Sequence, residues 1–168
     1  FSSISDKIIC QSDTSYIILH QGSLYRQTIS EKEPELILPE LKRVKSIFKI
    51  GETVFMLNEK NEYFQYDIIH HTLTLVKVLD DKGKTFNEAY SSLVPYWETG
   101  MKNPIFIEHG NAWEFSYENK NIKARLIFTG IPSDALIRSI QYSSKNNTLF
   151  LGTDSKGLIV LNLPKVES

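Results

Sequence analysis

The chain has 168 residues, of which 41% are hydrophobic and 23% charged, and this globular composition argues against wholesale disorder. Nineteen basic residues against twenty acidic ones leave a formal charge of −1, which gives no electrostatic footprint for binding nucleic acid or an anionic membrane. The one cysteine, Cys10, excludes an internal disulfide and a cysteine-based zinc site. The chain begins at Phe1 rather than at Met, so we expect a processed chain or a piece of a longer protein.

Four segments of the chain share one layout, in which a short apolar strand precedes a tight polar turn and an alternating strand. In chain order, we expect the paired strands at 16–20 and 23–27, 53–57 and 62–66, 104–108 and 111–115, and 148–152 and 157–161. The first strands of these hairpins are spaced by 37, 51 and 44 residues. A propeller blade of four strands repeats at about 40–50 residues, so the spacing favours propeller blades.

Each hairpin has a further strand candidate on one or both sides, bounded by turn-forming residues. The upstream candidates are 3–9, 44–50, 91–97 and 137–142, and the downstream candidates are 35–41, 73–79 and 122–128. Together they predict an all-β chain that forms a single propeller segment over 1–168, with about four four-stranded antiparallel blades at 1–41, 42–80, 89–130 and 135–163. A single β-sandwich or barrel is the alternative, because short strands with regular turns suit those folds too.

A sheet that is apolar on both faces has to stack on neighbouring sheets around an axis. We therefore expect the innermost strands to be buried on both sides, as the runs Ile17–Leu19 and Leu149–Leu151 indicate. The fourth unit has no candidate outer strand. Either residues 1–9 fill that edge and close a ring, or the chain is a partial propeller, an open arc that exposes an edge strand and an apolar flank.

The last repeat carries the most informative residues, with IRSIQY at 137–142, NTLFLGTD at 147–154 and KGLIVL at 156–161. It resembles the two-component-regulator propeller repeat, whose pattern is a V-x-S-I strand, a loop, L-W-I-G-T and then G-G-L. Phe150 stands in place of the tryptophan and Lys156 in place of the first glycine of the pair.

The resemblance covers about 25 residues, and the other three units share mainly the spacing. Ser46-Ile47 and Ser92-Leu93 echo the S-I element. Such propellers form the periplasmic sensor regions of hybrid histidine kinases and related regulators in polysaccharide-degrading Gram-negative bacteria. The resemblance therefore implies a ligand-sensing portion of an extracytoplasmic sensor region, located in the periplasm.

The same resemblance implies the partners of the segment. An oligosaccharide or other small ligand would bind to it, and the remainder of the sensor chain would adjoin it. The intact protein would be a homodimer attached to the membrane through a segment outside this chain, and this segment would bind no nucleic acid.

The histidines and carboxylates do not form a recognisable reactive site. His70 and His71 are expected in a turn between outer strands, where neighbours in sequence point to opposite faces and do not share a metal ion. Glu108 and His109 are residue types that can act as an acid–base pair. They lie at the end of a strand and in the following turn with Gly110, however, where neighbours in sequence diverge in space. We therefore predict no catalytic residue, no metal site and no cofactor.

Three large aromatic residues, Tyr96, Trp97 and Trp113, are the candidates for ligand binding, together with His109. Sugars stack on exposed aromatic faces that have polar groups nearby, which is the reason for this choice. The competing hypothesis is that these side chains pack between blades.

Three functions compete on these observations. The leading one is a ligand-sensing module, which binds a glycan fragment without chemistry. The second is a non-catalytic interaction scaffold of the WD-repeat kind, although the Gly-His and Trp-Asp signature of those repeats is absent. The third is a propeller carbohydrate-active enzyme, which would need convergent carboxylates near the axis. The first strands begin instead with Tyr16, Thr53, Pro104 and Thr148.

Overall fold

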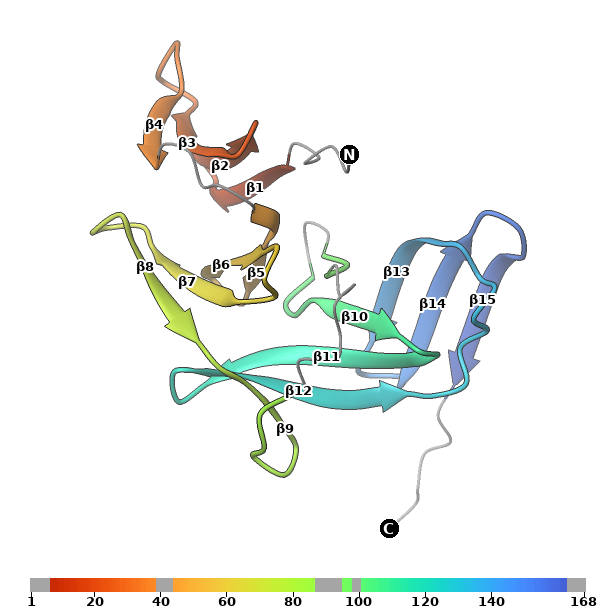
Figure 1. Ribbon diagram of the computed structural model, residues 1–168. Helices are drawn as coiled ribbons and strands as arrows, with labels where there is room; N and C mark the ends of the chain where they lie inside the picture. The colour runs from red at the N-terminus through yellow and green to blue at the C-terminus, as the bar shows by residue number, and fades with distance from the viewer. Residues whose placement is uncertain (1–6, 39–43, 87–94, 98–100, 163–168) are drawn as a thin grey trace.

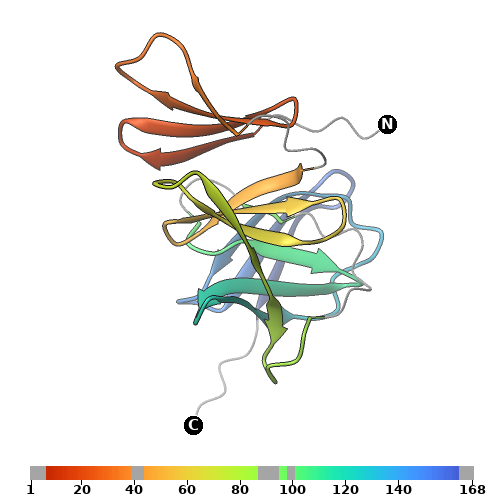
Figure 2. The ribbon, with the colours of Figure 1, turned by 60° about the vertical axis from the view of Figure 1, so that its left-hand side comes forward.

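The computed structural model describes residues 7–38, 44–86, 95–97 and 101–162, and these parts of the chain consist of β-strands joined by turns. The strands form four small sheets that follow one another in chain order along an arc (Figure 1). Figure 2 shows the first sheet at one end of the molecule, with the second sheet between it and the third. Among the residues described, no helix is long and apolar enough to cross a membrane.

The first two sheets are antiparallel meanders in which spatial order equals chain order. The first sheet holds β1 (Lys7–Ser12), β2 (Ser15–His20), β3 (Ser23–Thr28) and β4 (Glu35–Leu38). The second holds β5 (Val44–Ile50), β6 (Thr53–Asn58), β7 (Tyr63–Asp67) and β8 (Thr72–Val76). Four-stranded sheets of this topology, placed side by side around an axis, are the blades of a β-propeller.

The third and fourth sheets complete the arc. The third has the order β10 (Ile105–Glu108), β11 (Asn111–Glu118), β12 (Asn121–Phe128) and β9 (Val78–Asp80). The fourth has β13 (Ile137–Ser143), β14 (Thr148–Thr153) and β15 (Gly157–Asn162). The predicted all-β fold of four propeller blades is confirmed, and each of the four predicted hairpins is present to within a few residues.

The predicted strand at 73–79 is wrong, because the structure divides it between two sheets. Its first part, β8, pairs with β7 in the second sheet, and its last part, β9, pairs with β12 in the third. The chain changes sheet at Lys77, whose carbonyl accepts a hydrogen bond from the Ile122 amide at 2.9 Å. The β9–β12 pair is parallel, so the third sheet also departs from the expected antiparallel pattern.

Two further predictions are wrong: the strands expected to be innermost are not at the edge of their sheets, and residues 7–9 do not close a ring. The runs Ile17–Leu19 and Leu149–Leu151 lie in β2 and β14, and each of these strands is the second of its sheet rather than the innermost. Residues 7–9, offered as part of an outer strand for the fourth unit, belong to β1 and pair with β2. Residues 1–6 lie outside the described residues, as do most of the strand expected at 91–97, of which Tyr96 bridges Ile105.

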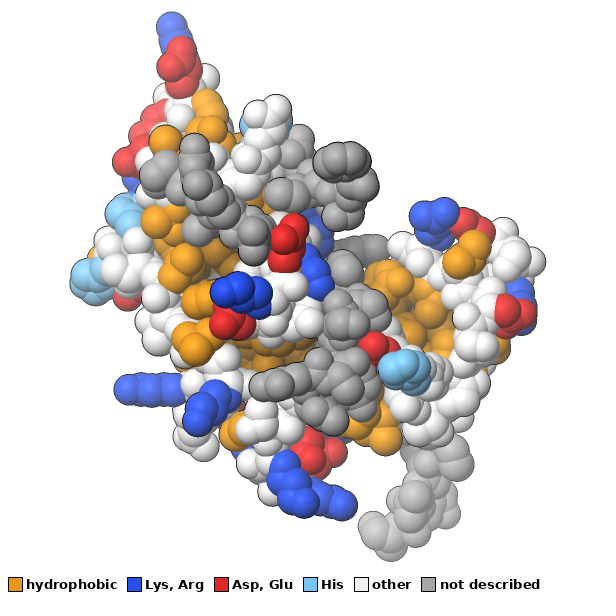
Figure 3. Space-filling view, viewed as in Figure 1, with side chains coloured by type: hydrophobic (Ala, Val, Ile, Leu, Met, Phe, Trp, Pro, Cys, Tyr) orange, Lys and Arg blue, Asp and Glu red, His pale blue; other side chains and the backbone are white. Residues whose placement is uncertain are grey.

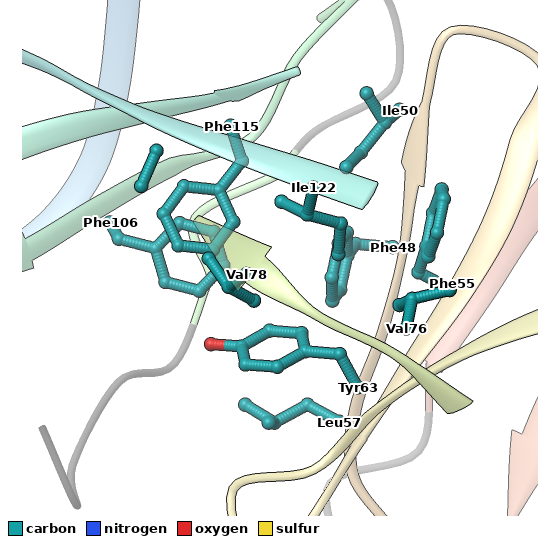
Figure 4. Close-up of a cluster of buried hydrophobic side chains, with 11 residues drawn as sticks. Phe48, Ile50, Phe55, Leu57, Tyr63, Val76, Val78, Phe106, Phe115 and Ile122 are labelled. Atoms are coloured by element: carbon teal, nitrogen blue, oxygen red, sulfur yellow. The ribbon is translucent and has the colours of Figure 1, made fainter. Parts of the chain in front are cut away.

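Three clusters of buried side chains hold the sheets together, and each joins two consecutive sheets. The cluster between the second and third sheets is aromatic (Figure 4). In it the rings of Phe106 and Phe115 stack with centroids 3.7 Å apart, and Phe48 meets Phe106 edge-on at 6.1 Å. Within the described residues, no cluster joins the first sheet to the fourth, so the contacts define an arc.

Two polar contacts add to the apolar packing between sheets. The Lys7 ammonium donates a hydrogen bond to Ser46 Oγ at 2.6 Å and so ties β1 to β5. Burial lowers the pKa of Lys7, which is the expected cost of placing this cation between two sheets. The Tyr117 hydroxyl donates to Gln65 Oε1 at 2.6 Å and ties the third sheet to the second.

We expect the substitution Phe106→Ala to reduce the free energy of unfolding by about 3–5 kcal/mol, because it leaves a cavity among stacked rings. This is a large share of the roughly 5–15 kcal/mol that stabilises an ordinary domain. Urea denaturation followed by tryptophan fluorescence measures it. Ile69→Ala is the control, since Ile69 is 83% exposed. Equal losses in the two variants would contradict the role given to the aromatic cluster.

Alkaline pH should destabilise the protein through two tyrosines in the core clusters. Burial raises the pKa of Tyr66 to about 12, and burial together with Glu108 raises the pKa of Tyr63. Both phenols therefore hold their protons more tightly in the folded than in the unfolded chain, so the stability they confer is complete below pH 10.0 and is lost as the pH rises towards about 12.

Urea midpoints measured across this pH range test this expectation. Tyr66→Phe should lose stability less steeply with pH than the parent chain, because it has one phenol fewer to ionise. A variant that follows the same slope as the parent would show that Tyr66 is not one of the groups responsible.

Candidate functional site

The structure distributes the four residues predicted to bind ligand over three places. Tyr96 and His109 line one cleft of about 520 Å³ between the third and fourth sheets. Trp97 lines a second cleft of about 410 Å³, beside β1 and the β5–β6 turn. Trp113 lines neither cleft, and its ring meets that of Phe86 edge-on at 4.9 Å. Both tryptophans pack against the aromatic cluster, and Trp97 also packs against the cluster between the first two sheets.

The cleft between the third and fourth sheets, called here the blade 3–4 cleft, is bounded by a turn, a loop and a strand. The β10–β11 turn forms one side, and the loop that leads into β13 forms the other. Figure 3 shows the surface hollowed beside the fourth sheet, with hydrophobic side chains gathered over β13 and β14. The side chains and backbone that line the cleft belong to Tyr96, Ile107–Gly110, Ile131–Ser133 and Ala135–Arg138.

The β10–β11 turn is built for close approach to the opposite loop. His109 and Gly110 both have positive φ, of 49° and 74°, which is the geometry of a two-residue type I′ hairpin turn. A side chain at position 110 would place its Cβ 2.9 Å from the Ile131 carbonyl oxygen, so only glycine fits there. The Gly110 carbonyl also accepts a hydrogen bond from the Ile131 amide at 2.9 Å, which joins the turn directly to the loop.

Charged and aromatic groups face each other across this cleft. The Glu108 side chain is 8% exposed, and its Oε1 lies 3.9 Å from Nδ1 of the exposed His109 ring. On the facing strand, Arg138 donates to Asp154 Oδ2 through Nε at 2.7 Å. The Tyr96 hydroxyl donates to the Ile137 carbonyl at 3.4 Å and so crosses from the third sheet to the fourth.

The protonation states at the cleft follow from these contacts. Burial raises the pKa of Tyr96, which keeps its hydroxyl a neutral donor in the physiological range. The hydrogen bond and the charge of Asp154 raise the pKa of Arg138, and the same contact lowers the pKa of Asp154. The pair therefore stays ionised around neutral pH and places a fixed cation at the rim of the cleft.

A β-bulge aims Arg138 at this site. The pairing of β13 with β14 shifts by one residue between Ile137 and Ser139, so Arg138 is the extra residue of the strand. Bulges bend a strand locally and re-aim a side chain, and they occur often at binding sites. Arg138 lies within the IRSIQY motif of the repeat, but nothing in that motif marks it as facing a cleft.

The second cleft has a different character. The Trp97 indole donates through Nε1 to the Met101 carbonyl at 3.1 Å, so the polar edge of the ring is engaged within its own loop. Lys49 is almost fully buried at the opposite wall and donates to Glu52 at 2.8 Å. Cys10 and Lys102 also line this cleft.

His70 and His71 line neither cleft. His70 contacts Asp67 Oδ2 at 2.8 Å, whereas Nδ1 of His71 lies 2.8 Å from the Tyr66 hydroxyl. The two imidazoles thus have different partners, as expected for neighbours in a turn. Within the described parts of the chain, no group of three or more His, Cys, Asp or Glu side chains is placed to hold a metal ion.

Comparison with known proteins supports the fold alone. No model of a known protein family matches the chain, and no curated protein matches it. PorZ, a bacterial surface component of the type-IX secretion system of Porphyromonas gingivalis, matches over 92% of this chain with a TM-score of 0.55 and 10% identity. BBS1N, solved in complex with ARL6DN, matches over 96% of this chain with a TM-score of 0.50 and 16% identity.

These structures are much longer than the chain. The match covers 19% of the PorZ chain and 51% of the BBS1N chain. At such low identities, the shared feature is the succession of β-propeller blades, and the activities of the longer proteins do not transfer to this one.

We expect Gly110→Ala to reduce the free energy of unfolding by about 1–3 kcal/mol, because an L-residue is strained at positive φ and its Cβ would meet the Ile131 carbonyl. Gly83→Ala is a matched control, since Gly83 has the same φ of 74° with open space around it. Gly83→Ala should reduce the free energy of unfolding by only about 1 kcal/mol, the backbone strain of an L-residue at positive φ. Denaturant titration of both variants measures the difference, and equal losses would show that the turn does not press on the loop.

Proposed function

We propose that this chain is a non-catalytic, ligand-sensing propeller portion of the extracytoplasmic sensor region of a two-component signal-transduction protein. The ligand is an oligosaccharide fragment, bound in the blade 3–4 cleft. Two independent observations support this proposal: the resemblance of residues 137–161 to the repeat of such sensors, and the groups that line the cleft. The repeat that carries the resemblance forms β13–β15, so it supplies one wall of the cleft.

The mixture of groups in the cleft is what favours a sugar. Oligosaccharides present hydroxyl groups on all sides and apolar C–H faces, so their sites combine an aromatic or apolar surface with donors and acceptors. Tyr96, Leu136 and Ile137 supply the apolar surface, and His109 and Arg138 supply polar groups. The volume of about 520 Å³ lies in the usual range of roughly 300–1,000 Å³ for small-molecule sites.

The carboxylates of the cleft favour binding over hydrolysis. Glycoside hydrolysis ordinarily uses a pair of carboxyl groups on opposite sides of the scissile bond. Of the residues that line the blade 3–4 cleft in the described chain, Glu108 alone carries a carboxylate. Asp154 lies close by, but its carboxylate is engaged by Arg138. A sugar in this cleft would therefore be held rather than cleaved.

Binding at a boundary between blades offers a route to a signal. A ligand that contacts both His109 on the third sheet and Arg138 on the fourth favours one relative placement of the two sheets, in proportion to its difference in affinity for the alternatives. The Tyr96 hydroxyl already links the same two sheets through Ile137. In a homodimeric membrane sensor, such a bias would pass to the remainder of the chain.

A second candidate function is a non-catalytic interaction scaffold. It is favoured by the apolar residues that remain exposed on the outer faces of the first and fourth sheets, such as Ile8 and Leu158. Exposed apolar patches of this kind are characteristic of interaction surfaces.

The proposal predicts that oligosaccharides derived from xylan, mannan or pectin bind the chain with affinities measurable by isothermal titration calorimetry. His109→Ala and Arg138→Ala should each weaken the binding of the responding sugar at least about tenfold, because each removes a hydrogen-bonding group of the cleft. Both side chains are largely exposed, so the fold should persist.

His70→Ala is the matched control, since His70 is an equally exposed histidine in a distant turn. It should leave the affinity unchanged. Sugar binding that is unaffected by the two cleft variants would contradict the assigned site, and the absence of any binding up to millimolar concentrations would contradict the glycan proposal.

A further inference from the structure

The outer face of the first sheet is a continuous apolar row. Ile8, Ile18, Tyr25 and Leu36 are cross-strand partners in successive strands, so they lie on one face of the sheet. The opposite face packs against the second sheet, whereas on this face Ile8 is 64% exposed and Leu36 50% exposed. We call this row the first-sheet flank.

The outer face of the fourth sheet carries apolar side chains on β14 and β15, whereas β13 contributes Gln141, the partner of Phe150, to the same face. Phe150 pairs with Val160, and Leu158 lies one pair further along the same face. The neighbouring residues Leu149 and Leu151 point to the third sheet and are buried, but Leu158 is 65% exposed and Val160 44% exposed. Phe150, Leu158 and Val160 form the fourth-sheet flank.

The first-sheet flank repeats the pattern of a face that is already used for packing between blades. In the second sheet, the row Ile47, Met56, Phe64 and Leu75 crosses the four strands in the same way, and its inner members pack against the first sheet. The residue types match position by position: Ile8 corresponds to Ile47, Ile18 to Met56, Tyr25 to Phe64 and Leu36 to Leu75. The first-sheet flank therefore has the form of a surface that receives a preceding blade.

The fourth-sheet flank has the complementary form. Each interior sheet uses one face for the blade before it and the other for the blade after it, and the fourth sheet uses its Leu149 and Leu151 face for the third sheet. The face with Phe150 and Val160 is thus directed to a following blade. The two ends of the arc therefore present the two kinds of face that the interior sheets use for packing, one towards a preceding blade and one towards a following blade.

We propose that the two flanks pack against each other between two copies of this chain, with the fourth-sheet flank of each copy on the first-sheet flank of the other. Such a head-to-tail contact is heterologous, and it closes when the rotation per copy allows a ring. Two copies supply eight sheets, which is within the usual four to eight blades of a propeller. The inference stands on the packing faces and is independent of the sugar proposal.

Two double variants test the two flanks and the head-to-tail direction of their contact, in sedimentation-velocity experiments on the full 168-residue chain. The parent chain should be dimeric at micromolar concentration. Ile8→Asp combined with Leu36→Asp disables the first-sheet flank, and Leu158→Asp combined with Val160→Asp disables the fourth-sheet flank. Each double variant alone should be monomeric, because every contact in the ring needs one flank of each kind.

An equimolar mixture of the two double variants should recover a one-to-one heterodimer, since one intact pair of flanks remains. Ile69→Asp is the control, because Ile69 is 83% exposed in a turn away from both flanks, and it should stay dimeric. Circular dichroism checks that each variant keeps its β-structure.

Three outcomes would overturn the proposal. A monomeric parent chain would mean that two copies do not cover the flanks, as when further blades of a longer protein cover them. A double variant that still dimerises alone would show that like flanks pair with like. A mixture that remains monomeric would show that the two flanks do not recognise each other.

Discussion

The stacking of one sheet face on the next is the constraint on which the rest of this structure depends. An isolated sheet of short strands is at best marginally stable, because half of its apolar side chains have nothing to pack against. Here the alternation along each strand sends one set of residues towards the preceding sheet and the other towards the following one. The second sheet illustrates both directions, with Met56 packed towards the first sheet and Phe55 towards the third. The clefts lie at the boundaries that this stacking creates.

The passage of the chain from β8 to β9 reinforces the boundary that carries the largest aromatic cluster. By leaving the second sheet at Val76 and joining the third at Val78, the chain places two buried valines on either side of a single exposed lysine, Lys77. Sequence patterns did not predict this, because the apolar run continues without Gly or Pro to interrupt it. The run is divided only by the pairing of its residues. Val76 pairs with Tyr63 in the second sheet, whereas Val78 pairs with Ile122 in the third.

The hairpins could be predicted from the sequence because their information is local. Two apolar strands and a turn such as Gln21-Gly22, with both residues at positive φ, specify the register without help from distant residues. The candidate site depends on tertiary structure instead. Tyr96, His109 and Arg138 come from three separate segments and meet only because the third and fourth sheets stack. Trp113 and Trp97 show the same limit, since both pack against core clusters and nothing in their neighbours reveals that Trp97 also lines a cleft.

The repeat pattern in the fourth unit has a physical explanation in the pairing of its first two strands. Ser139 and Gly152 are direct partners across β13 and β14, and a Cβ at position 152 would lie 2.3 Å from Ser139 Oγ. The serine of the first strand and the glycine of the second thus fit together as a pair. In the second sheet, Ser46 follows a bulge at the equivalent place, but it faces Leu57 and accepts a hydrogen bond from Lys7. A serine that follows a bulge is therefore common to the second and fourth sheets. The fourth sheet adds the glycine, and its bulged residue, Arg138, faces the cleft.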